Sequence, residues 1–544
     1  MEALDWLVIG VFFLALIGII VWVVRQKQND SADYFLGGRD ATWLAIGASI
    51  FASNIGSEHL IGLAGAGASS GMAMAHWEIQ GWMILILGWV FVPFYSRSMV
   101  YTMPEFLERR YNPQSRTILS VISLVSYVLT KVAVTVYAGG LVFQQVFGIK
   151  ELWGIDFFWI AAIGLVVLTA LYTIFGGMKS VLYTSVLQTP ILLLGSLIIL
   201  VLGFKELGGW DEMMRVCGAV TVNDYGDTMT NLIRSNDDAN FPWLGALIGS
   251  AIIGFWYWCT DQFIVQRVLS GKNEKEARRG TIFGAYLKLL PVFLFLIPGM
   301  IAFALHQKYI GAGGEGFLPM LANGTANADA AFPTLVAKLL PAGVKGLVVC
   351  GILAALMSSL ASLFNSSAML FTIDFYKRFR PETPEKKLVG IGQIATVVIV
   401  ILGILWIPIM RSVGDVLYTY LQDVQSVLAP GIAAAFLLGI CWKRTSAQGG
   451  MWGLIAGMVI GLTRLGAKVY YSNAGEVADS TFKYLFYDMN WLFFCGWMFL
   501  FCIIVVIVVS LATEAPTAEK IQGLVFGTAT KEQKAATRAS WDHW

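Results

Sequence analysis

The stretch SNIGSEHLIGLAGAGASSG, residues 53–71, lies inside a long apolar run, yet it carries Asn54, Glu58, His59 and five glycines in nineteen residues. A lipid bilayer offers no hydrogen bonds. Polar side chains and helix-weakening glycines are therefore tolerated at membrane depth only where they face protein, a ligand or a water-filled cavity. The stretch is a candidate binding site within a membrane-spanning helix.

The composition places the whole chain in the membrane class. Of its 544 residues, 57% are hydrophobic and only 13% are charged, and the mean hydropathy is +0.69. These values are too apolar for a soluble protein. The net charge is only +2 and the basic residues are spread over short loops, which argues against nucleic acid as a partner. The six cysteines form no disulfide framework and no CxxC metal pattern.

Apolar runs of roughly 20 residues, the length needed to cross a bilayer, predict an all-α polytopic membrane protein. Thirteen such spans cover residues 3–24, 43–71, 80–101, 117–147, 153–175, 178–204, 242–266, 280–306, 343–376, 386–410, 414–440, 448–470 and 489–512. The first run has no basic start and no small-residue cleavage site, which favours a retained helix over a signal peptide.

The basic residues predict how the chain crosses the membrane. They gather in the loops after spans one, three, seven, nine and eleven, whereas the other short loops hold little more than Lys150 and Arg411. Because cytoplasmic loops carry the excess of Lys and Arg, the N-terminus is predicted outside. With an odd number of spans, the C-terminus of this chain is then cytoplasmic. The predicted location is the plasma membrane, or the inner membrane of a bacterium.

Two irregular spans occupy matching places five spans apart. Span two holds the opening stretch, and span seven reads GSAIIGFWYWCTDQ (249–262), with a Trp-Tyr-Trp cluster and Asp261 where Leu and Val are expected. Such a pair is typical of an inverted-repeat transporter whose substrate binds between broken helices. Helix packing is the alternative, since Gly67 and Gly71 form a GxxxG motif that needs no ligand. A channel is a further alternative, although the sequence has no ring-like filter repeat.

Other polar and aromatic residues fall inside predicted spans. Lys288 lies about eight residues from the basic edge at Arg279, or about 12 Å along a helix, so its ammonium should pair with a buried acceptor or a ligand hydroxyl. A shifted helix end would instead leave it at the interface. Glu78 lies at the start of span three, where it could bind a ligand or be an interfacial carboxylate. Gln422 could bind a ligand or form a hydrogen bond between helices. Tyr257 and Trp258 fall near mid-span, where an aromatic belt does not explain them.

Together with Asn54 and His59, these residues supply amide, imidazole, carboxylate, ammonium and aromatic groups. The set suits a neutral polyhydroxy ligand, because hydroxyls need donors and acceptors and the apolar face of a sugar ring stacks on aromatic side chains. A polytopic membrane enzyme, such as a lipid-linked glycosyltransferase, would need a paired acid/base or metal constellation. Only the isolated Asp261 and Glu58 are candidates, so no catalytic residue is predicted.

Five runs resemble the sodium/solute symporter family, specifically its sodium/glucose cotransporter branch. They are ASIFASNIGSEHLIGLAGAGASSG (48–71), FWYWCTDQFIVQRVLS (255–270), YLKLLPVFLFLIPGM (286–300), LAALMSSLASLFNSSAMLFTIDFY (353–376) and AAAFLLGICWKR (433–444). The resemblance covers almost the whole chain. It implies a leucine-transporter-type core of two inverted five-helix repeats, and Na⁺-driven import of a sugar by alternating access. Members of the family usually carry one more C-terminal span than the thirteen predicted here.

The resemblance also implies a division of the chain. The predicted segments are an N-terminal extra helix and loop (1–42), a first repeat (43–206), an outer loop (207–241), a second repeat (242–440), C-terminal helices (441–512) and a cytosolic tail (513–544).

Roles for individual residues follow from the same resemblance. The sugar-contacting residues of the family fall on Asn54, His59, Glu78, Tyr257, Trp258, Lys288 and Gln422, with Tyr257 resembling an inner aromatic gate. Its sodium site falls on the backbone carbonyls of Ala52, Ile55 and Ala355 and on the hydroxyls of Ser358 and Ser359. Oxygen ligands suit Na⁺ as a hard cation, and an unwound helix exposes such carbonyls. Packing of small residues is the alternative for the two serines.

The expected function is therefore Na⁺-coupled import of a hexose or a similar neutral polyol. A second sodium site of some relatives uses a Thr or an Asp at positions that are Ala361 and Ser185 here, so one Na⁺ per sugar is predicted. The alternatives within this scaffold are a myo-inositol or other solute symporter, and a sugar sensor that does not transport.

Overall fold

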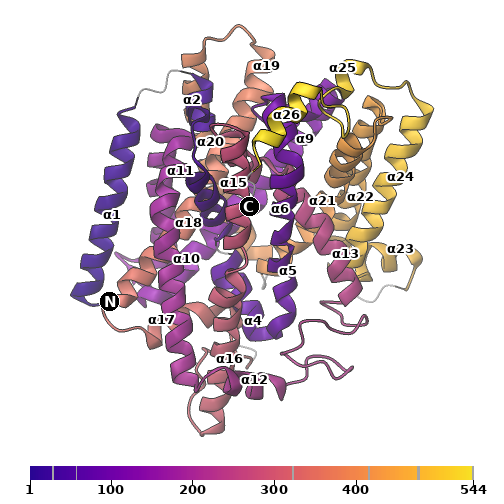
Figure 1. Cartoon of the computed structure of the whole chain (residues 1–544). Coiled ribbons are helices and arrows are strands. Elements are labelled where there is room, and N and C mark those ends of the chain that lie inside the picture. The colour runs from indigo at the N-terminus through magenta and orange to yellow at the C-terminus, as the bar shows by residue number, and fades with distance from the viewer. Residues whose placement is uncertain (27–29, 57, 322–323, 414–416, 474–477, 542–544) are drawn as a thin grey trace.

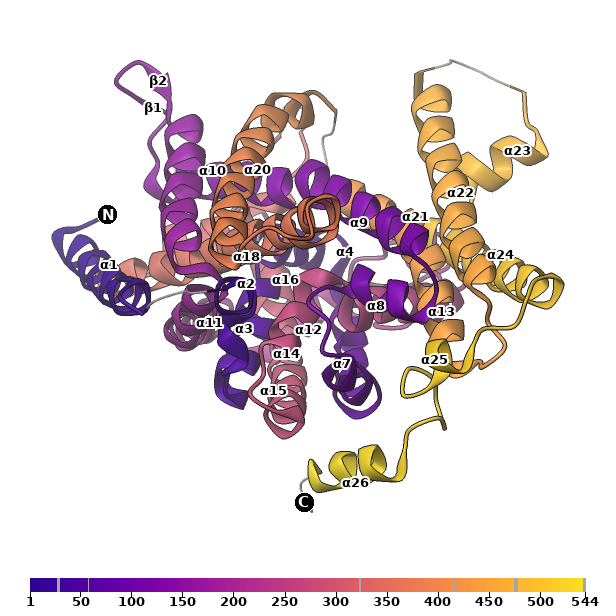
Figure 2. The ribbon, with the colours of Figure 1, turned by 90° about the horizontal axis from the view of Figure 1, so that it is seen from above.

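The computed structural model describes residues 1–26, 30–56, 58–321, 324–413, 417–473 and 478–541. These residues form a bundle of helices that run along one common direction (Figure 1). One two-stranded hairpin, β1 (Glu151–Leu152) with β2 (Ile155–Asp156), occurs among the described residues. Seen along the bundle, α1 and α24 lie at opposite edges and α16 lies near the middle (Figure 2).

The first half of the chain contains long helices interrupted by short 3-10 and π segments. Its helices are α1 (Ala3–Val24), α2 (Ser31–Leu36), η1 (Gly37–Arg39), α3 (Trp43–Asn54), η2 (Glu58–Leu63), α4 (Ala64–Ser70), η3 (Gly71–Met74), α5 (Ala75–Ile79), η4 (Gln80–Trp82), α6 (Met83–Ile86), η5 (Leu87–Phe91), α7 (Val92–Ser98), α8 (Met103–Arg110), α9 (Pro113–Ser126), η6 (Tyr127–Val132), α10 (Ala133–Phe147), α11 (Phe157–Leu207) and α12 (Trp210–Gly218).

The second half is built in the same way. Its helices are α13 (Trp243–Gly254), η7 (Phe255–Thr260), α14 (Gln262–Leu269), α15 (Glu274–Leu287), η8 (Val292–Leu296), α16 (Ile297–Gly311), η9 (Ala328–Ala330), α17 (Ala331–Leu339), α18 (Val344–Met369), η10 (Leu370–Tyr376), α19 (Lys377–Phe379), α20 (Glu385–Val413), α21 (Leu417–Cys441), α22 (Ala447–Asn473), α23 (Thr481–Lys483), η11 (Tyr484–Asp488), α24 (Trp491–Ala512), α25 (Ala518–Ile521) and α26 (Lys531–Ala539).

The lengths of these helices agree with a membrane protein. Within the described ranges, ten helices are long and apolar enough to cross a membrane, and two shorter apolar helices lie at Trp43–Asn54 and Ala133–Gln144. One of the ten, α11, has 51 residues and contains a break at Gly177, where φ is +53°. This break falls between the predicted spans 153–175 and 178–204. The predicted thirteen spans are compatible with this arrangement.

The break at Gly177 has a clear steric cause. A Cβ atom at this position would lie 2.4 Å from the backbone carbonyl oxygen of Tyr34. A positive φ is also unfavourable for a residue with a side chain. Glycine therefore allows the chain to turn here and to pack closely against α2.

The start of α1 and the segment that follows the last long helix lie toward opposite ends of the bundle. The start of α1 is in the lower half of Figure 1, whereas α25 is at the top. An odd number of crossings requires such a placement. The predicted outer loop (207–241) contains the short helix α12, the segment between predicted spans eight and nine contains α17, and the predicted tail contains α25 and α26.

The centre of the bundle is made by helices from both halves of the sequence. Helix α18 packs along α11, and α3 packs against α15, α11 and α18. Helices α21, α22 and α24 pack against one another at one side, where α13 joins them. This packing buries the interrupted helix α3–η2–α4 among helices that are distant in sequence.

Candidate functional site

Both irregular spans are interrupted in the structure. Helix α3 ends at Asn54, and Ile55 has an extended backbone with φ −78° and ψ 96° before the chain resumes as the π-helical η2. In span seven, the π-helical η7 ends at Thr260, and Asp261 is extended with φ −75° and ψ 128° before α14 begins. Single π-helical turns often occur at functional sites because they displace side chains and free backbone groups.

A buried ionic cluster lies between these two interruptions, with Lys288 of the α15–η8 segment at its centre. The Lys288 Nζ atom lies 2.5 Å from Asn54 Oδ1, 2.8 Å from His59 Nε2 and 2.6 Å from Glu78 Oε2. The contact with Glu78 is an ion pair by distance, without the geometry of a directed hydrogen bond. Lys288 is only 3% exposed and Glu78 only 2%, so neither side chain reaches the protein surface, where the interfacial alternative would place it.

The His59 ring contacts both charged members of the cluster through one nitrogen. His59 Nε2 lies 2.8 Å from Lys288 Nζ, which can only donate, and 3.1 Å from Glu78 Oε1, which can only accept, so the two contacts require opposite roles of this nitrogen. The other ring nitrogen, Nδ1, is buried and has no hydrogen-bond partner among the described residues. It is therefore open to a hydroxyl of a ligand, which can either donate to it or accept from it.

Aromatic rings complete this cluster. Asn54 Nδ2 donates to the Tyr257 hydroxyl at 3.0 Å. The rings of Tyr257 and Trp258 meet edge to face, with centroids 4.9 Å apart, and Lys288 Nζ lies 5.6 Å from the centre of the Trp258 ring. Polar groups and flat apolar faces thus adjoin in one place.

Six of the seven predicted sugar-contacting residues line one small cavity. Its lining includes Asn54, His59, Trp77, Glu78, Gln80, Ile253, Tyr257, Trp258, Lys288 and Gln425, and its volume is about 20 Å³. This is close to the space of one water molecule, so a hexose requires these side chains to separate. The side chain of the seventh residue, Gln422, lies outside the described part of the structure. Gln425, one turn further along α21, lines the cavity and was not predicted.

Sequence reasoning also missed a second buried ion pair beside this cavity. Lys131 Nζ lies 2.6 Å from Asp261 Oδ2 and 4.6 Å from the centre of the Tyr257 ring. The Tyr127 hydroxyl donates to the other oxygen of Asp261. Asp261 is therefore not isolated, and it also caps α14 through Phe263 N. A lone lysine in the apolar run YVLTKVAV (127–134) was the available signal.

The predicted sodium ligands come together where α3 ends against α18. Ala52, Ile55, Ala355, Ser358 and Ser359 are each at most 5% exposed. Ser359 Oγ donates to the Ser53 carbonyl at 2.7 Å, and Ala355 lies one helical turn before the two serines. A Cβ atom on Gly56 would lie 2.8 Å from Ser359 Oγ, so glycine is needed for this close approach. The assignment of these oxygens to Na⁺ stays a prediction.

A group of buried hydroxyls continues from this point toward α11. Ser53 Oγ lies 2.7 Å from Ser362 Oγ and 3.5 Å from Ser358 Oγ, and Ser185 Oγ lies 3.3 Å from Ser358 Oγ. The Arg267 Nε atom donates to Ser53 Oγ at 3.2 Å. Arg267 is fully buried, and its two terminal nitrogens have no hydrogen-bond partner in the described part of the chain.

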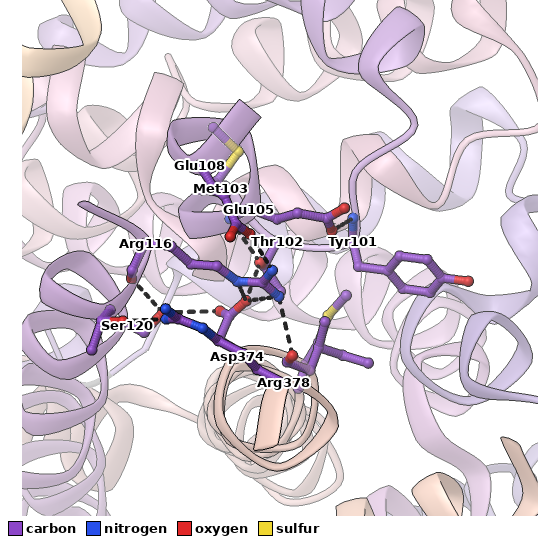
Figure 3. Close-up of polar contacts among 12 residues, drawn as sticks. Tyr101, Thr102, Met103, Glu105, Glu108, Arg116, Ser120, Asp374 and Arg378 are labelled. Carbon is purple, nitrogen blue, oxygen red and sulfur yellow. Dashed lines mark hydrogen bonds and ion pairs between the residues drawn. The ribbon is translucent and has the colours of Figure 1, made fainter. Parts of the chain in front are cut away.

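Another polar network ties the segment from Thr102 through α8 and α9 to η10 (Figure 3). The buried carboxylate of Asp374 accepts from Arg116 Nε at 2.7 Å, from Thr102 Oγ1 at 2.8 Å and from Ser120 Oγ at 3.1 Å. Arg116 also bonds to Glu108 Oε2 at 2.6 Å. The network therefore connects segments that belong to different predicted repeats.

We expect Arg116→Met to lower the free energy of unfolding by about 1–3 kcal/mol, because Asp374 would keep only neutral hydroxyl partners at a buried position. The thermal unfolding midpoint of the purified protein in detergent measures this loss. Arg378→Met is the matched control, since Arg378 is exposed and donates to two neutral acceptors, the Thr117 hydroxyl and the Pro113 carbonyl. Equal losses in the two variants would contradict a special role of the Asp374 pair.

Comparison with known proteins identifies the family. Residues 34–457 match the model of the sodium:solute symporter family. The chain is 37% identical over 542 residues to the mouse sodium/myo-inositol cotransporter 2, covering 97% of this chain and 80% of that protein. It is 35% identical over 560 residues to the zebrafish sodium/glucose cotransporter 4, covering 99% of this chain and 84% of the relative.

Solved structures agree with this fold. A Na⁺-coupled sialic acid symporter in a substrate-bound outward-open state has a TM-score of 0.75 at 21% identity, covering 95% of this chain and 99% of that one. A nucleobase-cation-symport-1 family transporter has a TM-score of 0.52 at 14% identity, covering 91% and 98%. The predicted leucine-transporter-type fold class is confirmed. The chain belongs to the sodium:solute symporter family and is a Na⁺-coupled solute symporter of the membrane.

Proposed function

We propose that this symporter imports a neutral polyol, a hexose or a cyclic polyol such as myo-inositol, by alternating access. The observation that carries the proposal is the cluster of Lys288, Glu78, His59, Asn54 and Tyr257 between the two interrupted helices. The charges of Lys288 and Glu78 cancel, so the cluster favours a neutral solute. The hydrogen bonds among the members of the cluster can be exchanged for bonds to several hydroxyls.

The relatives support the same class of solute. Their names record myo-inositol and glucose as the transported solutes. These two molecules are neutral six-membered rings with several hydroxyls, and they differ in the ring oxygen and in the placement of the hydroxyls. The proposal therefore covers both, with the hexose as the first expectation and myo-inositol as the alternative.

Uptake into proteoliposomes with an inward Na⁺ gradient tests this proposal. We expect glucose, galactose or myo-inositol to accumulate only with Na⁺, and we expect K⁺ in its place to give no accumulation. Gluconate serves as an anionic control of similar size, and proline as a control of another chemical class. Preferred uptake of either control solute would contradict the proposal. Binding of a sugar without any Na⁺-driven flux would instead indicate a sensor.

We further infer that one Na⁺ moves with each solute. The buried hydroxyls of Ser53, Ser185, Ser358 and Ser362 lie close together. Among the described residues no carboxylate joins this set of hydroxyls, and Ala361 provides only a methyl group. Arg267 adds a positive charge at Ser53. A second buried cation would lack a compensating charge and would lie near a like charge, which is unfavourable.

The number of coupled ions sets a measurable limit on accumulation. One Na⁺ provides about 2.3 kcal/mol per 100 mV of membrane potential and about 1.4 kcal/mol per tenfold ion gradient. At 100 mV and a tenfold Na⁺ gradient, one ion supports a solute gradient of about three powers of ten, and two ions double that exponent. Reversal potentials in proteoliposomes at varied solute gradients give the ratio directly. A ratio near two would contradict the inference and would indicate that Ser185 or backbone carbonyls complete a second site.

The orientation of the chain is also a proposal. The basic loops predict that the start of α1 faces outward and that α25 and α26 are cytoplasmic. The network around Asp374 then lies on the inner side, where it can hold the two repeats together while the protein is closed inward. Labelling of single cysteines introduced at the exposed positions Glu382 and Ser480, with an impermeant reagent on intact cells, tests this orientation. We expect only Ser480→Cys to be labelled, and labelling of Glu382→Cys alone would contradict the proposed orientation.

A further inference from the structure

A second and larger pocket lies between span three and the start of span seven. It has a volume of about 400 Å³, and α5, η4 and α13 form its walls, with the segment 232–241 as its cover. Its volume lies within the range of about 300–1,000 Å³ that is typical of small-molecule sites. The pocket is distinct from the central cavity, although Gln80 lines both.

Four buried polar atoms in the lining of this pocket lack a hydrogen-bond partner in the described part of the chain. They are His76 Nε2, Gln80 Oε1, Arg234 Nε and Ser250 Oγ. Gln80, Arg234 and Ser250 are each no more than 7% exposed. A single unsatisfied buried polar atom costs about 1–3 kcal/mol, so four around one pocket indicate a ligand that satisfies them.

The hydrogen-bonding character of these atoms defines the ligand. His76 Nδ1 bonds to the Ala73 carbonyl, which can only accept, so the Nδ1 atom carries the hydrogen and Nε2 is an acceptor in the neutral ring. Gln80 Oε1 is also an acceptor, whereas Arg234 Nε is a donor. A hydroxyl group both donates and accepts, and it can satisfy atoms of each kind.

Charge does not contribute to the selection. The guanidinium of Arg234 already lies 3.5 Å from Asp238 Oδ2, and it also donates to the Ser70 carbonyl. Asp238 in turn accepts from the backbone amide of Phe241 at 2.7 Å. The pocket therefore presents an ion pair that is already formed, and an uncharged ligand fits it best.

The remaining lining is apolar and aromatic. The His76 and Phe241 rings meet with centroids 5.5 Å apart, and Trp82 and Trp243 stand at the rim with nearly half of their surface exposed. Leu247, on the same rim, is 65% exposed. The aromatic rings on the walls suit a ligand that itself contains rings. The exposed apolar rim of this membrane protein borders the lipid. Tryptophan is also enriched at the depth of the lipid headgroups.

The pocket shares its walls with the central site. Glu78 of the central cluster and Gln80 of the pocket lie two residues apart on span three, and Ser250 lies two turns before Tyr257 on span seven. Span three and span seven belong to different predicted repeats. A ligand between them would oppose their relative movement, which alternating access requires.

We propose that this pocket binds an uncharged apolar ring compound that carries a hydroxyl group, and that the bound compound slows transport. The hydroxyl bonds to His76 Nε2 or Gln80 Oε1 and accepts from Arg234 Nε, while the rings lie among Trp82, Trp243 and Phe241. Such a compound reaches the pocket either as a sterol of the bilayer or as a soluble phenol.

Binding of 4-phenylphenol to the purified full chain in nanodiscs tests the pocket without reference to transport. We expect its methyl ether, 4-methoxybiphenyl, to bind at least ten-fold more weakly, because the ether cannot donate to His76 or Gln80. His76→Phe keeps the ring against Phe241 and removes the acceptor, so at least a ten-fold loss is expected. Ala246→Leu fills the pocket and should abolish binding. Ala512→Leu, at the exposed end of α24, is the matched control and should leave the Kd unchanged.

Two results would overturn the proposal. One is equal affinity for the phenol and its ether, and the other is equal affinity of the phenol for Ala246→Leu and Ala512→Leu. Adding cholesterol to the nanodiscs separates the two sources. Competition with 4-phenylphenol assigns the pocket to a membrane sterol, and binding unaffected by cholesterol assigns it to a soluble phenol. For the effect on transport, we expect 4-phenylphenol to lower the maximal rate of Na⁺-driven uptake in the Ala512→Leu protein but not in Ala246→Leu.

Discussion

Lys288→Met is expected to weaken solute affinity at least a hundred-fold. The substitution keeps the length of the side chain but removes the ammonium that contacts Asn54, His59 and Glu78. Each unsatisfied buried partner costs about 1–3 kcal/mol, and two such losses of about 1.4 kcal/mol each amount to a factor of one hundred. Equilibrium binding of the transported sugar or polyol to purified protein at saturating Na⁺ measures the change.

The same substitution leaves the Glu78 carboxylate buried without its counter-charge. Removal of one partner from a buried ion pair typically destabilises a protein by about 3–5 kcal/mol, so Lys288→Met should also lower the thermal midpoint. The double variant Lys288→Met/Glu78→Gln removes the stranded charge and should recover most of this stability without recovering affinity. Lys308→Met is the matched control, since Lys308 lies outside the cluster and donates to the Leu207 carbonyl. Unchanged solute affinity in Lys288→Met would exclude Lys288 from the binding site.

Ser359→Ala is expected to raise the Na⁺ concentration for half-maximal uptake at least ten-fold. If Ser359 Oγ is a sodium ligand, its loss leaves the ion with one fewer oxygen in a buried site, where water cannot easily replace it. The variant also removes the bond from Ser359 to the Ser53 carbonyl, which is close to the end of α3. A Na⁺ titration of solute uptake in proteoliposomes measures the shift.

The readouts for this variant separate ion binding from solute binding. At saturating Na⁺, the solute affinity of Ser359→Ala should approach that of the parent protein, because the contacts around Lys288 are intact. Ser196→Ala is the matched control, a buried serine on α11 with 2% exposure. A Na⁺ titration of Ser359→Ala that coincides with that of Ser196→Ala would place the ion site elsewhere.

Much of the candidate site was predictable from residue type and depth. Asn54, His59, Glu78 and Lys288 are polar residues in or beside apolar runs. Burying such a side chain without a partner is so unfavourable that its presence in a span indicates a functional role. The structure places them in one cluster. Gln422 was selected both as a polar residue within a span and by resemblance, and its side chain lies outside the described residues. Gln425 was missed because sequence alone does not show which side of α21 faces the cavity.

The sequence by itself determined the membrane class, the approximate spans and the positions of the two interruptions. Hydropathy and glycine content are local properties, and in a bilayer they directly decide where a helix can lie and where it can break. Only the tertiary structure decided which charges meet. Lys288 joins Glu78 across 210 residues, Lys131 joins Asp261 across 130, and Ser185 lies beside Ser358. Each pairing depends on the rotation of a helix about its axis, about 100° per residue, and packing against neighbouring helices sets that rotation.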